Sequence, residues 1–125
     1  MIVEDYVSFE TAKLLKEKGF DEATIGYYPI IGKAKETFHK GAAYRWNYFS
    51  DRGIAAPTLQ MAMKWLRNKH DIFIEISVDE ILKDNGYQWA LYYNSTKEIM
   101  PYADWEKSYE EACEAAIKYC LEKLI

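Results

Sequence analysis

The residue types that most often act in catalysis are few in this chain, and they lie far apart in the sequence. Its two histidines are His39, in a lysine-rich loop, and His70, near the end of a predicted helix. A catalytic base needs a partner within hydrogen-bond reach, and the sequence places none beside either ring. A favourable interaction with the helix dipole explains His70. We therefore expect neither histidine to be catalytic.

The two cysteines, Cys113 and Cys120, lie seven residues apart on a predicted helix. At a rise of 1.5 Å per residue their Cα atoms are about 10 Å apart, whereas a disulfide needs less than about 7 Å. We expect free thiols that act as small buried hydrophobes, as in a reducing, cytoplasmic compartment.

Motifs for phosphate, metal and acyl chemistry are missing from the sequence. It has no glycine-rich phosphate loop, no paired-cysteine pattern and no Gly-x-Ser-x-Gly elbow. The acids Asp79, Glu80 and Asp84 lack the spacing of a calcium loop. We expect no catalytic residues, no metal and no cofactor, and a small enzyme stays open only because fold does not determine function.

One constellation supports a binding hypothesis, because basic and aromatic side chains alternate over residues 40–52. Its members are Lys40, Tyr44, Arg45, Trp46, Tyr48, Phe49 and Arg52. On an open sheet face such aromatics stack on bases while the cations meet phosphates. Exposed Tyr and Trp equally favour protein partners, and the same rings also suit a core.

Charge is distributed unevenly along the chain, whose net charge is −4. Residues Lys33–Lys69 hold eight basic and two acidic side chains, and the remainder holds eight basic and eighteen acidic ones. Such asymmetry can mark a surface that binds nucleic acid or an acidic partner. The alternative is that the charged side chains only cover solvent-exposed faces and bind no partner.

The element around which the chain is organised is an amphipathic helix followed by an alternating strand, within residues 55–79. Apolar positions of the helix follow the 3.6-residue period: Leu59, Ala62, Met63 and Leu66. The period then changes to two, with Ile72, Ile74, Ile76 and Val78 on one face. A helix lying across a sheet is predicted.

The flanking segments complete the predicted fold. Ser8 caps a first helix over residues 9–18 that ends at Gly19, and a Ser108–Glu111 capping box opens the last helix. Strands are predicted at four places: 23–31, where Gly26 indicates a bulge or close approach, 42–50, 72–78 and 87–93. A short helical turn is expected at 80–83, and the turn at 94–101 leads into a short last strand.

These elements predict a single α+β domain over residues 1–125. Its order is α-β-β-α-β-β-α, in two layers, with an antiparallel sheet of about four strands and three helices. A chain of 125 residues, half of them hydrophobic and 29% charged, suits one globular domain without a membrane span.

Three strings, DYVSFETAKLLKEKGFDE, APTLQMAMKWLRNKHDIFIEI and YEEACEAAIKYCLEKLI, make the chain resemble a group of small uncharacterised bacterial proteins. Such proteins are often carried on prophages and other mobile elements. The resemblance covers both ends and the centre, and it implies an accessory protein that binds host or phage components. It carries over no catalytic residues.

We therefore predict a non-enzymatic binding module that acts on a protein partner, as a phage or mobile-element accessory protein. The predicted contact residues are Arg45, Trp46, Tyr48, Lys64 and Arg67. The alternative is a nucleic-acid-binding module that uses the basic, aromatic-rich Lys33–Lys69 region. A homodimer through aromatic sheet edges is compatible with the sequence, and a membrane partner is not expected.

Overall fold

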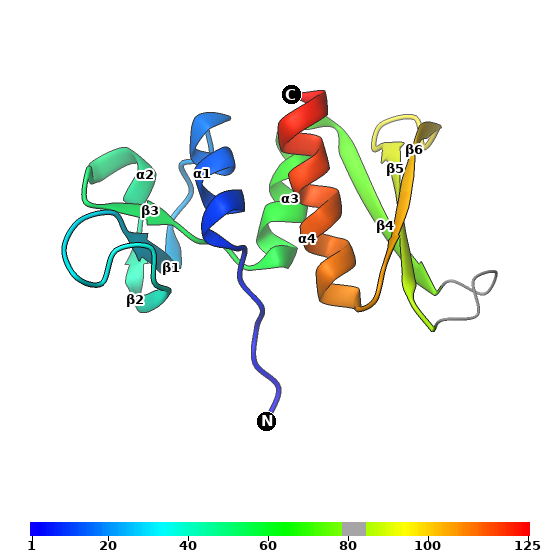
Figure 1. The fold of residues 1–125 in the computed structure, drawn as a ribbon. Coiled ribbons are helices and arrows are strands. Elements are labelled where there is room, and N and C mark those ends of the chain that lie inside the picture. The colour runs from blue at the N-terminus through cyan, green and yellow to red at the C-terminus, as the bar shows by residue number, and fades with distance from the viewer. Residues whose placement is uncertain (79–84) are drawn as a thin grey trace. The chain divides into compact units, whose positions relative to one another are not determined.

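A computed structural model describes residues 1–78 and 85–125, and the predicted helical turn at 80–83 lies outside them. The chain divides into two compact units, Met1–Gln60 and Met61–Ile125. Both units contain helices and strands (Figure 1), which confirms the α+β class. The predicted single sheet of about four strands is wrong, because two antiparallel sheets of three strands each are present.

In the first unit, local capping signals set helix α1 (Phe9–Glu17). The Thr11 amide donates to Ser8 Oγ at 3.2 Å. Gly19 takes a φ of 95°, and the Phe20 amide then donates to the Leu15 carbonyl at 2.9 Å. This is a Schellman ending, and both predicted ends of the helix are confirmed.

The first sheet has the order β2-β1-β3, formed by β1 (Thr24–Pro29), β2 (His39–Tyr44) and β3 (Gly53–Ala55). Its register shifts between Thr24 and Gly26, and a Cβ on Gly26 would stand 2.6 Å from the Ala56 carbonyl oxygen. The predicted bulge and close approach at Gly26 are both confirmed.

The predicted strand over 42–50 ends early, at Tyr44, and a helical turn α2 (Trp46–Phe49) follows. The cause is the Asn47 side chain. Its amide nitrogen donates to the Phe20 carbonyl at 2.7 Å, and its amide oxygen accepts from the Ala55 amide at 3.0 Å. These bonds hold the turn, so Tyr44, Trp46 and Tyr48 do not alternate on one strand face.

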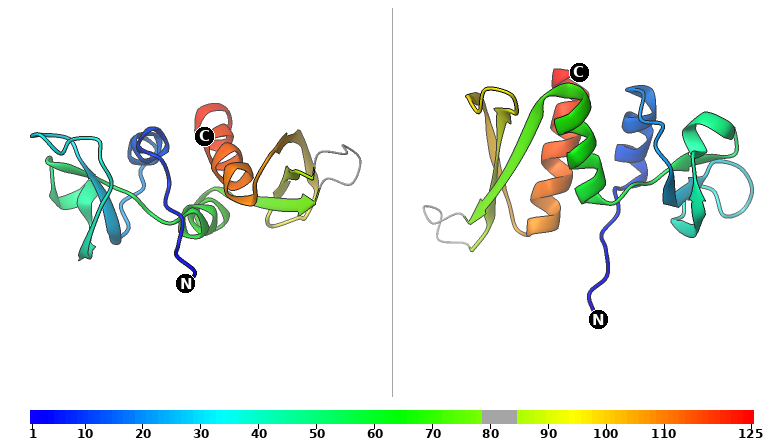
Figure 2. Two further views of the ribbon diagram at one scale, coloured as in Figure 1. Left: turned by 60° about the horizontal axis from the view of Figure 1, so that its bottom comes forward. Right: turned by 180° about the vertical axis from the view of Figure 1, so that it is seen from behind.

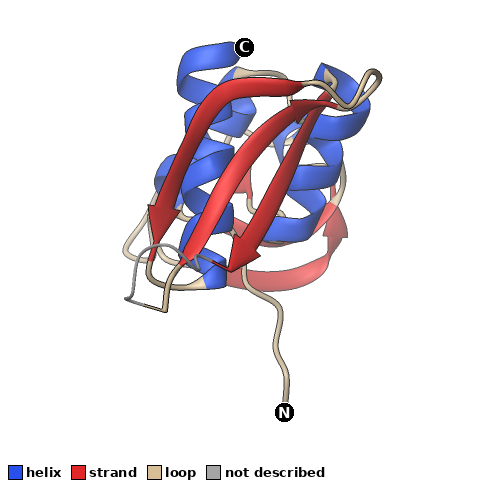
Figure 3. Cartoon of the chain, turned by 90° about the vertical axis from the view of Figure 1, so that its right-hand side faces the viewer, coloured by secondary structure: helices blue, strands red, loops and turns tan. Residues whose placement is uncertain are grey.

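The second unit is built on a sheet of order β4-β5-β6, formed by β4 (Ile72–Val78), β5 (Tyr87–Tyr93) and β6 (Ile99–Glu106). Its register pairs Ile74 with Leu91 and Ile76 with Trp89. Helix α4 (Tyr109–Tyr119) covers one face of this sheet, as Figures 2 and 3 show from different sides. The last strand is longer than predicted.

Helix α3 (Leu59–His70) buries the predicted apolar stripe and also Trp65, and it lies beside α4 (Figures 1 and 2). Asp71 follows it with a φ of 57°, and its two carboxylate oxygens accept from the Ser95 amide and hydroxyl, each at 2.7 Å. These bonds fix the turn from helix to strand.

Helix α4 begins at the predicted cap, where the Glu111 amide donates to Ser108 Oγ at 3.1 Å. It continues into a π-helical turn, η1 (Cys120–Leu124). Cys113 and Cys120 are buried thiols, as predicted, and burial raises the pKa of the Cys120 thiol to about 12. Over the described residues, no helix combines the length and apolarity needed to cross a bilayer.

Candidate functional site

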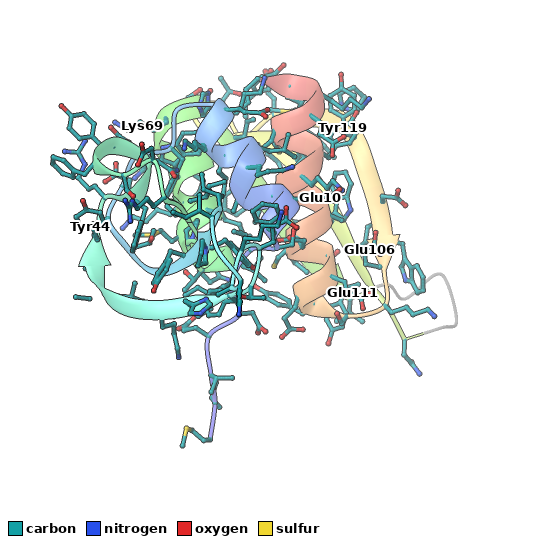
Figure 4. All side chains as sticks on the ribbon, turned by 60° about the vertical axis from the view of Figure 1, so that its left-hand side comes forward. Glu10, Tyr44, Lys69, Glu106, Glu111 and Tyr119 are labelled. Atoms are coloured by element: carbon teal, nitrogen blue, oxygen red, sulfur yellow. The ribbon has the colours of Figure 1, made fainter. Side chains whose placement is uncertain are left out.

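The first unit exposes three neighbouring aromatic side chains, which we call the aromatic surface: Tyr44, Tyr48 and Phe49. Their exposed fractions are 41%, 63% and 60%. Tyr44 stands at the end of β2 (Figure 4), and the other two come from α2. The Phe49 ring centroid lies 4.7 Å from that of Tyr48 and 5.9 Å from that of Tyr44, so the rings form one cluster.

Arg45 holds this cluster in place. Its guanidinium carbon lies 4.2 Å from the Tyr48 ring centroid and 5.5 Å from that of Phe49. The same group donates from Nη2 to the Asp21 carboxylate at 2.9 Å, and from Nε to the Asp21 carbonyl at 3.0 Å. Because Arg45 is paired with Asp21 and lies against two rings, it positions the surface, while its side chain stays 41% exposed.

Trp46 supports the aromatic surface from within the unit. Its ring stacks on Tyr27, with centroids 4.2 Å apart and planes 20° apart. On another side it lies against Gly53, where an added Cβ would stand 2.8 Å from Trp46 Cε3. Tyr44 meets the Trp46 ring edge to face at 5.0 Å. Trp46 is half-buried, so its first role is to hold Tyr44 and α2.

Of the five predicted contact residues, the structure brings together Arg45, Trp46 and Tyr48. Lys64 and Arg67 belong to α3 in the second unit, with Lys64 exposed and Arg67 half-buried. Sequence reasoning missed Asp21 as the partner of Arg45. The two residues are 24 positions apart, and no local pattern relates them.

The basic region of the sequence is divided between the two units. Residues 1–60 contain eight basic and eight acidic side chains, and residues 61–125 contain eight basic and twelve acidic ones. The first unit is therefore neutral overall and the second is acidic. The local charge excess of residues 33–69 does not make either unit basic.

The two histidines belong to different units. His39 lies 2.9 Å from the Thr37 carbonyl through Nδ1, and His70 packs on Trp65 with ring centroids 4.8 Å apart. Burial lowers the pKa of His70, opposite to the increase that a helix C-terminus alone produces. In the described part of the chain, His, Cys, Asp and Glu form no group of three or more suited to a metal ion.

No protein-family model matches the chain, and no curated protein or solved structure matches it either. The candidate site is therefore defined by the geometry of this chain alone.

Proposed function

We propose that this chain is a non-enzymatic binding module that contacts a protein partner through the aromatic surface. The observation that carries the proposal is that the aromatic rings are exposed to solvent and are also held by neighbouring side chains. Tyr48 and Phe49 are about three-fifths exposed, yet Arg45 lies against both rings, and Trp46 packs on the neighbouring Tyr44. Aromatic side chains that are already ordered lose little conformational entropy when a partner covers them.

The energetics allow a specific but moderate affinity. Covering one large apolar side chain contributes about 1.5–3 kcal/mol. Covering three such rings makes a favourable contribution to the binding free energy. The cost of the translational and rotational freedom lost on association must be subtracted from it. A dissociation constant in the micromolar range, equivalent to about −8 kcal/mol, is therefore the expected scale.

Two observations favour a protein over a nucleic acid as the partner. Arg45, the cation nearest to the rings, is paired with Asp21 at 2.9 Å. The unit that carries the rings has equal numbers of acidic and basic side chains. Nucleic-acid affinity depends on unpaired cations that release counterions from phosphates. We further propose that this partner is a host or phage component, as expected for an accessory protein of a mobile element.

The test compares the wild-type chain with a Tyr48→Ser, Phe49→Ser variant in quantitative pull-downs from bacterial lysates with and without phage. The matched control is Ile99→Ser, which removes an exposed aliphatic side chain from the second unit. We expect one set of proteins to be lost by about tenfold or more in the double variant, as for hot-spot residues, and retained in the control.

Two further measurements keep the proposal falsifiable. The first is fluorescence anisotropy with labelled DNA and RNA across a salt series. The proposal is overturned if the chain binds nucleic acid strongly at low salt, if this binding weakens as the salt concentration rises, and if the double variant still binds. Sedimentation identifies a second copy of the chain as the partner if the wild type self-associates and the double variant does not. Identical pull-downs from wild type and double variant also overturn the proposal.

A further inference from the structure

Strand β4 forms one edge of the second sheet, whose strands lie side by side in Figure 3. It pairs with β5 along its whole length, Ile72–Val78, without a shift of register. No other described strand pairs with β4, so the backbone groups on its outer side have no strand partner. Such a row of amide and carbonyl groups is a template for a further strand.

The backbone groups of β4 that point outward are identified by one hydrogen bond. The Asn94 amide donates to the Asp71 carbonyl at 2.9 Å, directly before the strand begins. Because the peptide bond after Asp71 is trans, the Ile72 N–H points to the opposite side from this carbonyl, away from β5. The direction then alternates from residue to residue along an antiparallel pair. The residues whose amide and carbonyl groups point outward are Ile72, Ile74 and Ile76.

Among the described strands, the three other sheet edges carry features that hinder pairing with a further strand. Strand β2 has Lys40 and a register shift, β3 has three residues, and Pro101 of β6 lies within a second register shift. Lysine, short length, proline and bulges are the usual protection of edge strands. Strand β4 is seven residues long, IFIEISV, with no lysine, proline or bulge. Its edge is therefore open to pairing.

The same strand of a second copy matches this edge. In an antiparallel pairing about a two-fold axis at Ile74, this residue lies opposite its own copy, and Ile72 lies opposite Ile76 of the second copy. Outward groups then meet outward groups, and the residues of each pair donate to each other's carbonyl groups. The one charged side chain of the strand, Glu75, lies opposite Phe73 of the second copy. An axis at Glu75 would instead place two carboxylates opposite each other, which is destabilising.

This register also extends the apolar face of β4. Ile72, Ile74 and Ile76 alternate with the polar positions of the strand and share the face on which α4 packs. Ile72 and Ile74 are buried, whereas Ile76 is only half-buried. In the paired strands, Ile72 of the second copy lies beside Ile76 and removes more of its apolar surface from water, which favours association.

We propose that two copies of this chain associate through the β4 edge and form one continuous antiparallel sheet. A two-fold contact of this kind uses the same edge on both copies and therefore closes at a dimer. The edge belongs to the second unit, whereas the aromatic surface belongs to the first. The Tyr48→Ser, Phe49→Ser variant should therefore self-associate as the wild type does, and either proposal can fail alone.

The first test is sedimentation velocity of the full chain over a concentration series, in which we expect a reversible equilibrium between monomer and dimer. Phe73→Lys and Phe73→Glu lose the same ring but bring opposite charges to Glu75 of the second copy. Since this contact occurs twice across a two-fold axis, Phe73→Lys should dimerise about tenfold more tightly than Phe73→Glu. Gln88→Lys and Gln88→Glu are the matched controls, on the central strand β5, and should dimerise equally.

The second test is amide hydrogen exchange of the wild type, measured by NMR. As the concentration rises, the amides of Ile72, Ile74 and Ile76 should become protected, whereas those of Phe73 and Glu75 bond to β5 and should be protected throughout. In a sample that mixes ¹³C-labelled and unlabelled chains, an intermolecular nuclear Overhauser effect should join the Hα atoms of Phe73 and Glu75. These residues form a closely spaced, non-hydrogen-bonded pair in the proposed register.

Several outcomes overturn the proposal. A chain that stays monomeric over the series does so, as does equal dimerisation of Phe73→Lys and Phe73→Glu. Protection of the Ile74 amide that is already complete in the monomer would show that another part of the chain covers the edge. Self-association that the Tyr48→Ser, Phe49→Ser variant abolishes would assign the contact between copies to the aromatic surface instead.

Discussion

Over the described residues, the two sheets have the same number of strands, yet their aromatic residues have different roles. In the first sheet no residue of the edge strand β2 is buried, and the α2 turn beside it has no buried residue. In the second sheet Trp89, Ala90 and Leu91 of the central strand β5 are buried. Phe49 is 60% exposed and Trp89 is 4% exposed.

The difference lies in what covers each aromatic residue. Helix α4 packs on all three strands of the second sheet, and Trp89 of the central strand is buried. At α2 the restraint comes from side chains, namely the Arg45–Asp21 pair and the Asn47 bonds. Aromatic side chains that a helix covers stabilise the fold. Those held only by neighbouring side chains stay exposed and available to a partner.

The largest expected effect tests this division of roles. Leu91→Ala removes a fully buried side chain from the centre of the second sheet and should lower the free energy of unfolding by about 2–5 kcal/mol. Phe49→Ala should lower it by less than about 1 kcal/mol, as for surface substitutions. Urea denaturation followed by circular dichroism measures both.

The control for Leu91→Ala is Ile99→Ala, at a side chain of the same sheet that is 64% exposed, and its effect should be as small as that of Phe49→Ala. Equal losses in Leu91→Ala and Phe49→Ala would contradict the comparison, because they would place Phe49 in a core.

The elements predicted correctly from sequence are those with local signals. Ser8, Gly19 and Ser108 act within a few residues of the helix ends that they set. The alternation of Ile72 and Ile74 identified β4 because side-chain direction in a strand repeats every two residues. Such signals need no knowledge of distant parts of the chain.

Three errors involve contacts between distant positions. Asn47 bonds to Phe20, which lies 27 residues away, and this contact turns the predicted strand into α2. The pairing of Arg45 with Asp21 is equally remote, so sequence reasoning treated Arg45 as a free cation. The division into two sheets also depends on which strands pair, and strand periodicity does not specify pairing.

An intermediate effect is expected where the aromatic surface depends on its support. A Cβ added in Gly53→Ala would stand 2.8 Å from Trp46 Cε3, so the ring must move. We expect a loss of about 1–3 kcal/mol in unfolding free energy, typical of overpacking, and weaker partner binding because Tyr44 rests on Trp46. Near-ultraviolet circular dichroism should also report the disturbed Tyr27–Trp46 stack.

Gly41→Ala is the matched control for Gly53→Ala. The nearest atom to its added Cβ lies 3.8 Å away, on Tyr27, which is an ordinary contact. Its stability and near-ultraviolet spectrum should match those of the wild type. An unchanged spectrum in Gly53→Ala would instead show that Trp46 does not need its present position.

The smallest effect concerns Glu106 of β6, whose neighbours include the acids Asp104 and Glu111. Because the pKa of Glu106 is raised in the folded chain, the folded state is penalised wherever this carboxylate is charged. The penalty is fully present above the folded pKa and disappears as the pH falls below the unfolded pKa, since the carboxyl is then protonated in both states. Glu106→Gln should therefore be more stable than the wild type at pH 7, by less than about 1 kcal/mol, and the difference should vanish near pH 4.

Melting temperatures of wild type, Glu106→Gln and the control Glu98→Gln at pH 7 and pH 4 measure this difference. The control should show neither the gain nor its pH dependence, because the penalty arises from the acids around Glu106. If Glu106→Gln is less stable than the wild type at pH 7, the carboxylate has a compensating cation within the chain. That cation would outweigh the burial and the acidic neighbours that raise the pKa of Glu106.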